Sequence, residues 1–124
     1  MSKFKGIVVD TDDTFEEREF TDLKDMQGAV NGLVEHIVVD DNVHLYVNEE
    51  ALLVDMPVNL TVEWWLNQRL YGDTIGYKFW LRGPVVIFGG IDDSGRETDV
   101  KPEIMAELEQ SRPDLLRHPD SVGK

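Results

Sequence analysis

Two pairs of aspartates stand directly after short apolar runs of the chain. Asp10 and Asp12 follow an Ile-Val-Val run, and Asp92 and Asp93 follow the most apolar run, 84–88, and its two glycines. Clustered carboxylates are the ligands that a hard cation such as Mg²⁺ needs. If both pairs met in one cleft, they could hold a metal ion that assists phosphoryl transfer. A metal-dependent phosphohydrolase is therefore the first hypothesis.

The first pair belongs to the sequence Asp10-Thr11-Asp12-Asp13-Thr14. It resembles the nucleophile motif of haloacid-dehalogenase-type phosphatases, which implies a nucleophilic first Asp and an acid/base second Asp. Asp13 stands where those enzymes have glycine, and a chain of 124 residues is short for their several strand–helix units. Asp is also common in ordinary turns after a strand. We therefore expect no enzymatic activity and no metal or other cofactor, and keep the phosphohydrolase as the alternative.

Composition narrows the remaining classes of protein. The chain has 12 basic and 25 acidic residues, a formal net charge of −13, and no cysteine. Disulfide scaffolds, cysteine-ligated zinc and thiol catalysis are excluded. Direct nucleic-acid binding is disfavoured, because phosphates attract an excess of Lys and Arg. With 41% apolar residues, the chain can bury one core.

The negative charge is concentrated in the first half of the chain. Residues 10–55 hold 14 acidic and two basic residues, whereas residues 56–91 are nearly neutral and hold all three tryptophans. The acidic residues of 10–55 either form a solvated surface or bind a protein partner that has a basic surface. In a narrower form, their carboxylates would mimic nucleic-acid phosphates and block a nucleic-acid-binding protein. The predicted partner-binding residues are Asp12, Asp13, Glu16, Glu17, Glu49, Glu50 and Trp64.

Trp64 is included because it is adjacent to Trp65 on an expected helix. Neighbouring helical residues cannot both face the core, so one of the two indoles is a candidate interface anchor. The histidines His36, His44 and His118 have no metal-binding spacing. His36 and His44 are expected on facing strands, where they can form a cross-strand pair.

Hydrophobic periodicity predicts the elements that position these residues. We expect strands over 4–9 and 15–20, a helix from an N-cap at Thr21 to a stop at Asn31-Gly32, and a hairpin of strands 33–39 and 43–47. A helix over 62–70 with Asn59 or Thr61 as its cap, a buried strand over 84–88, an acidic loop over 91–99 and a helix over 100–110 follow. The fold class is α+β, with a mostly antiparallel sheet packed against two or three helices.

One domain is expected over residues 1–110, followed by a disordered tail over 111–124. The N-terminal apolar run is too short for a signal peptide or a membrane span, which predicts a cytoplasmic protein without membrane contact. The predicted core consists of Ile7, Val9, Leu23, Met26, Val30, Ile37, Val39, Leu45, Val47, Leu66, Val86 and Phe88.

Several segments together carry a family resemblance. The helix has the pattern Leu23-x-x-x-Gln27-x-x-Val30-x-Gly32, and the later segments Asn48-Glu49-Glu50, Asn59 and Gly83 to Gly90 keep the same order. Over about residues 4–100 the chain resembles the small phage and actinobacterial proteins of domain of unknown function family 3846. It departs from them at Ala51, where a glycine commonly follows the two glutamates.

The resemblance implies a phage or mobile-element origin, a bacterial host cytoplasm and no assigned activity. It also implies that Asp10-x-Asp12 is a family strand end rather than a phosphatase signature. The predicted function is therefore that of a non-enzymatic, phage-type accessory protein that binds a host or phage macromolecule through its surface.

Overall fold

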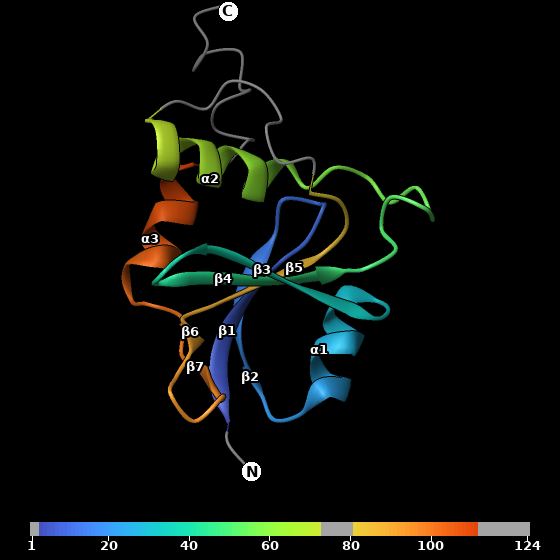
Figure 1. Cartoon of the computed structure of the whole chain (residues 1–124). Helices are drawn as coiled ribbons and strands as arrows, with labels where there is room; N and C mark the ends of the chain where they lie inside the picture. Colours follow the sequence, from blue (N-terminus) through green and yellow to red (C-terminus); the bar gives the residue numbers. More distant parts are fainter. Residues whose placement is uncertain (1–2, 73–80, 112–124) are drawn as a thin grey trace, which may run out of the picture.

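The computed structural model describes residues 3–72 and 81–111, and Figure 1 shows how their helices and strands are arranged. The first half contains β1 (Phe4–Val9), β2 (Phe15–Phe20), α1 (Leu23–Val30), β3 (Val34–Asp40) and β4 (Val43–Asn48). The second half contains α2 (Leu60–Tyr71), β5 (Val85–Phe88), β6 (Gly90–Ile91), β7 (Glu97–Thr98) and α3 (Glu103–Gln110).

Five strands form one antiparallel sheet in the order β2-β1-β5-β4-β3. The central strand β5 is buried along its whole length, as expected for the most apolar run of the chain. Val85 at its start pairs with both Val9 and Val47, so β1 and β4 end at the same end of the sheet. The α+β fold class and the mostly antiparallel sheet are confirmed.

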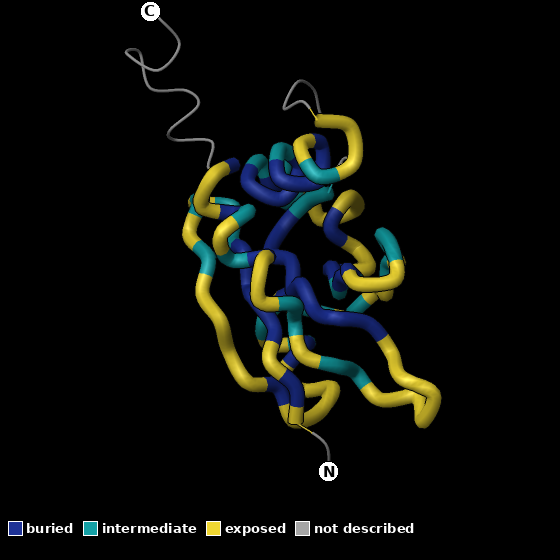
Figure 2. The backbone as a smooth tube through the Cα atoms, turned by 90° about the vertical axis from the view of Figure 1, so that its left-hand side faces the viewer, coloured by how far each residue is buried: buried dark blue, intermediate teal, exposed yellow. Residues whose placement is uncertain are grey.

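Helices cover both faces of this sheet (Figure 1). On one face α2 and α3 bury a core that includes Trp65, Leu66 and Leu108 against Ile7 and Leu45. On the other face α1 buries Met26 and Val30 against a second cluster that includes Phe4, Phe20 and Phe88. Figure 2 shows the buried residues running through the interior, with exposed residues concentrated in the turns and the outer strand segments.

Most predicted elements are present with small shifts at their ends. The predicted β3–β4 hairpin forms, with a register irregularity between Val38 and Asp40. The expected acidic loop over 91–99 contains a short hairpin, because β6 and β7 pair across a turn in which Asp92 Oδ1 accepts the amides of Ser94 and Arg96. Helix α3 begins at Glu103 instead of residue 100, with Pro102 at its N-cap position.

The ends of α1 differ from the prediction by one residue each. Asp22, not Thr21, is the N-cap, and its carboxylate accepts the amide of Asp25 at 3.0 Å. At the other end Asn31, not Gly32, adopts the left-handed conformation, with φ at 63°. Asparagine tolerates this conformation better than most residues. Gly32 is needed for a different reason, because it leaves room for the side chain of Asn48.

The predicted core is largely correct. Leu23 is the clear exception: it is 53% exposed, because it is the first residue of α1, at the end of the helix stripe whose buried members are Met26 and Val30. Ile37 and Val39 are half-buried because β3 is an edge strand. Ser111, the first residue of the predicted tail, is buried at the end of α3. The remainder of the predicted tail, 112–124, lies outside the described residues.

Candidate binding surface

Two acidic turns lie at the same end of the sheet. One turn follows β1 and contains Asp10, Asp12 and Asp13, and the other follows β4 and begins with Glu49 and Glu50. Because Val85 pairs with both Val9 and Val47, the two turns are separated by the width of one strand. The fold thus brings together two groups of carboxylates that the charge pattern selects from distant parts of the sequence. We call residues 10–14 and 49–55 the acidic end.

The carboxylates of the first turn are used mainly within the turn. Asp10 Oδ1 accepts the amide of Thr11 at 2.7 Å, and Asp12 Oδ1 accepts both the amide and the hydroxyl of Thr14. These hydrogen bonds, chiefly that from the hydroxyl, hold the pKa of Asp12 below its usual value. Asp12 remains exposed and charged at neutral pH, so it can still attract a cationic partner.

Asp13 has a structural role that sequence reasoning missed. Its Oδ1 accepts the hydroxyl of Thr61 at 3.1 Å, next to the N-terminus of α2, where a negative charge is favoured by the helix dipole. It also adopts a left-handed backbone conformation, with φ at 69°. Asp13 therefore joins the turn to α2, and its carboxylate is only partly available to a partner.

The second turn presents three consecutive apolar side chains to solvent. Leu52, Leu53 and Val54 are 70%, 84% and 58% exposed. The turn is ordered by main-chain hydrogen bonds, among them those from the amides of Val54 and Met56, and is anchored by the buried Ala51. Acidic residues precede and follow the apolar tip as Glu49, Glu50 and Asp55. An apolar tip between carboxylates, held by main-chain hydrogen bonds, is suited to docking on another molecule.

The edge strand β2 adds further charge. Glu16, Glu17 and Glu19 are exposed, and the intervening Arg18 binds Glu16 at 2.6 Å. Their register opposite β1 places Glu16 and Glu17 on opposite faces of the sheet. The carboxylates therefore do not form one uninterrupted row on a single face.

Asp92 and Asp93 lie far from the acidic end. They follow β6, which continues from the last residue of β5 through Gly89, whose amide donates to the carbonyl of Thr98. Asp10 instead follows Val9, which pairs with Val85 at the start of β5. The two aspartate pairs therefore occupy opposite ends of the sheet. Within residues 3–72 and 81–111, no group of three or more His, Asp or Glu side chains is placed to hold a metal ion. This arrangement disfavours the phosphohydrolase.

The two tryptophans of α2 divide as predicted. Trp65 is 1% exposed in the core, and Trp64 is half-buried on a different side of the helix. Trp65 Nε1 donates to Glu107 Oε1 at 3.0 Å. Trp64 as an interface anchor stays a prediction.

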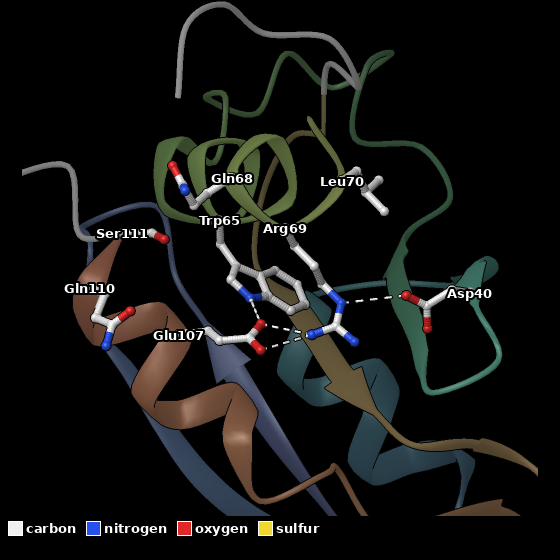
Figure 3. A pocket seen from close by; sticks show the side chains of 8 residues that line it. All are labelled: Asp40, Trp65, Gln68, Arg69, Leu70, Glu107, Gln110 and Ser111. Carbon is white, nitrogen blue, oxygen red and sulfur yellow. Dashed lines mark hydrogen bonds and ion pairs between the residues drawn. The ribbon is translucent and has the colours of Figure 1, made fainter. Parts of the chain in front are cut away.

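A hollow with a volume of about 480 Å³ lies between α2 and α3 (Figure 3). Arg69 Nη1 binds both oxygens of Glu107, at 2.8 and 2.9 Å, and its Nε lies 3.4 Å from Asp40. These carboxylates favour the charged guanidinium and raise the pKa of Arg69, although burial opposes them. The one guanidinium of the hollow is paired with both of its carboxylates, so it resembles a structural ion-pair network more than a ligand site.

The asparagines of the family pattern also have structural roles. Asn48 Nδ2 donates to the carbonyl of Val30 at 3.0 Å and joins the end of β4 to the end of α1. Asn59 Nδ2 donates to the carbonyls of Val9 and Gly83, while its Oδ1 accepts the amide of Val62 as the N-cap of α2. Both side chains are buried.

The other members of the pattern support the same junction. The carbonyl of Gln27 accepts the amides of Asn31 and Gly32 and closes α1. Gly32 lies against the side chain of Asn48. Together, these residues fix the base of the acidic end.

A polar cluster occupies the α1 face of the sheet next to Phe88. His36 Nε2 lies 2.7 Å from His44 Nδ1, and the hydroxyl of Tyr46 donates to Glu97 Oε2 at 2.8 Å. The expected cross-strand pairing of His36 and His44 is present. Burial and the neighbouring His36 lower the pKa of His44, while burial and Glu97 raise the pKa of Tyr46.

The fold and surface define a small α+β domain whose sheet carries two acidic turns at one end. A family model described as Domain of unknown function (DUF3846) matches residues 4–112. The chain belongs to this family, as the sequence pattern predicted. No curated protein and no solved structure matches it. No helix among residues 3–72 and 81–111 has the length and apolar character needed to cross a membrane. The phage origin and the cytoplasmic location stay predictions.

Proposed function

We propose that this domain is a non-enzymatic accessory protein that binds a basic surface of a partner protein through its acidic end. The observation that carries the proposal is the turn after β4, where Leu52 and Leu53 are 70% and 84% exposed between flanking carboxylates. Exposed apolar side chains in a contiguous, ordered group are typical of interaction sites. The apolar tip supplies contact area, and the acidic residues select a cationic surface.

Charge complementarity favours a protein partner over other macromolecules. Between Lys24 and Arg69 the chain contains no Lys or Arg, although it contains eight acidic residues. Nucleic acids and anionic lipid surfaces would be repelled by this segment. If the acidic residues mimic nucleic-acid phosphates, the partner is a nucleic-acid-binding protein. The interrupted charge pattern of β2 supports general complementarity more than a copy of phosphate spacing.

The test compares the wild type and two variants of the full chain as baits in a lysate of the organism that carries the gene. Leu52→Ser together with Leu53→Ser removes the apolar tip without removing charge. Leu23→Ser is the matched control, because Leu23 is 53% exposed at the start of α1, at the other end of the sheet. We expect a protein retained by the wild type and the control to be lost from the tip variant. Equal retention by all three baits would contradict the proposal.

A further inference from the structure

The two edges of the five-stranded sheet differ in how they are protected. The outer edge of β2 carries the exposed residues Glu16, Glu17, Arg18 and Glu19. Charged side chains of this kind block pairing with another strand. The outer edge of β3 carries Val34, His36, Ile37 and Val38, with Glu35 as its one charged residue before Asp40. Val38 is 61% exposed.

From Val34 to Val38, before the register irregularity, the main chain of β3 presents a regular set of groups along this edge. The carbonyl of Leu33 accepts the amide of Glu49 at 2.8 Å, so Leu33 turns its main-chain groups toward β4. In an antiparallel pair, consecutive residues alternate between facing the neighbouring strand and facing away. The register then turns Glu35 and Ile37 toward β4, and Val34, His36 and Val38 away from it.

Two hollows lie beside β3 on the face that α2 covers. One, of about 210 Å³, is lined by apolar residues that include Ile37, Val39 and Leu70. The other, of about 290 Å³, is lined by Glu35, Glu49 and Arg82 among mainly apolar residues, so its charged groups leave an excess of one negative charge. Both hollows are lined by Leu81, so they are neighbours. One hollow suits an apolar side chain, and the other suits a side chain with a positive charge.

We propose that β3 receives an extended segment of the partner as a sixth strand, and that this segment presents one apolar and one basic side chain on the face that α2 covers. Strand addition gives affinity through main-chain hydrogen bonds and specificity through pockets for alternate side chains. The edge ends next to the acidic end, because Leu33 pairs with Glu49 at the start of the Leu52–Leu53 turn. This proposal rests on the proposed function and names the way in which the partner is bound.

The charge of the chain argues for a partner segment over a second copy of the domain. A pair of β3 strands would bring together two domains that each carry a formal charge of −13. Like-charge repulsion of this size opposes self-association. A basic segment would instead be attracted by Glu35, Asp40 and Asp41 along the β3–β4 hairpin, where neither Lys nor Arg is present.

Hydrogen–deuterium exchange on the full chain tests the proposal, using the protein that the wild-type bait retains. We expect the amides of His36 and Val38 to exchange fast in the free domain and at least tenfold more slowly in the complex. Val38→Pro removes one outward amide at an edge position, and Val38→Ala is the matched control that keeps it. Val38→Pro should weaken binding at least tenfold, and Val38→Ala should bind like the wild type.

Each other outcome has a distinct meaning. Binding without protection of His36 and Val38 would overturn strand addition and leave the proposed function intact, even if Val38→Pro failed to fold. If the Leu52→Ser, Leu53→Ser bait loses the partner while Val38→Pro binds it like the wild type, strand addition would likewise be overturned and the proposed function would stand. A dimer of the free domain in light scattering, abolished by Val38→Pro, would show that a second copy occupies the edge. Retention of no partner by the wild type would overturn both proposals.

Discussion

Gly32 and Asn48 are in such close contact that a Cβ atom added at Gly32 would lie 2.6 Å from Asn48 Nδ2. The same nitrogen donates to the carbonyls of Val30 and Asn31, which are main-chain acceptors at the C-terminus of α1. Gly32 is therefore small because Asn48 must pass it to reach the helix end. This junction holds the turn that begins at Glu49.

The first prediction concerns this junction. Asn48→Ala leaves the helix-end carbonyls and the amide of Glu50 without their side-chain partner, which we expect to cost about 2 kcal/mol of unfolding free energy. Gly32→Ala should also destabilise the domain in the wild type, but much less in the Asn48→Ala background. Urea unfolding of the two single variants and the double variant measures this coupling. Strictly additive effects would contradict a direct contact between the two residues.

A second prediction concerns the contact between α2 and α3. Glu107→Gln removes the ion pair with Arg69 while keeping an oxygen that can accept from Trp65 Nε1. Arg69 has only 18% of its side chain exposed, so we expect a loss of about 1–2 kcal/mol in urea unfolding. Glu103→Gln serves as the control, because Glu103 is exposed on the same helix. Equal losses for the two variants would mean that the ion pair contributes nothing specific.

A third prediction concerns pH. The pKa of His44 is lower in the folded domain than in the unfolded chain, chiefly through burial and then through His36, although Asp40 and Asp41 oppose the shift. The unfolded state therefore binds more protons between the lowered pKa and about 6.5, so stability should rise with pH through this window. His44→Gln should reduce that rise. Urea unfolding midpoints at about pH 5 and about pH 7 measure this rise in stability. An equal change of midpoint in the wild type and in His44→Gln would contradict the prediction.

The fourth prediction concerns catalysis. We expect no magnesium-dependent hydrolysis of p-nitrophenyl phosphate, because Asp10 and Asp92 lie at opposite ends of the sheet. Asp10→Asn is the control for trace contamination, since it removes the residue that would act as nucleophile. Turnover by the wild type that is lost in Asp10→Asn would restore the phosphohydrolase.

The sequence is sufficient for features that depend on local pattern. Alternation of apolar and polar residues locates β4, and the apolar run 84–88 identifies the buried strand β5. Features that depend on tertiary contacts cannot be predicted in this way. Asp13 is selected for its charge, but its contact with Thr61 depends on where α2 begins, 48 residues later in the chain.

The exposed tip shows the same limit for the candidate site. Leu52, Leu53 and Val54 are apolar, so their pattern is compatible with a continuation of the preceding strand or with a short tight segment. Their exposure follows from the turn that starts at the buried Asn48 and is closed by Met56. The acidic flanks are visible in the sequence, whereas the apolar tip between them requires the fold.

Charge at the acidic end is proposed to drive association, and the association rate constant of the retained partner tests this most directly. The charge-reversal variant combines Asp12→Lys, Glu49→Lys and Glu50→Lys, which are exposed at the acidic end, and leaves out Asp13, because that residue supports the N-terminus of α2. Surface plasmon resonance would compare it with the wild type at about 0.1 M and about 1 M salt, where the screening length falls from ~10 Å to ~3 Å.

We predict that the wild-type rate constant falls at least tenfold between these salt concentrations, and that the reversal variant associates slowly at both. Rate constants that are equal for the two proteins at both salt concentrations would contradict a role for this charge in binding.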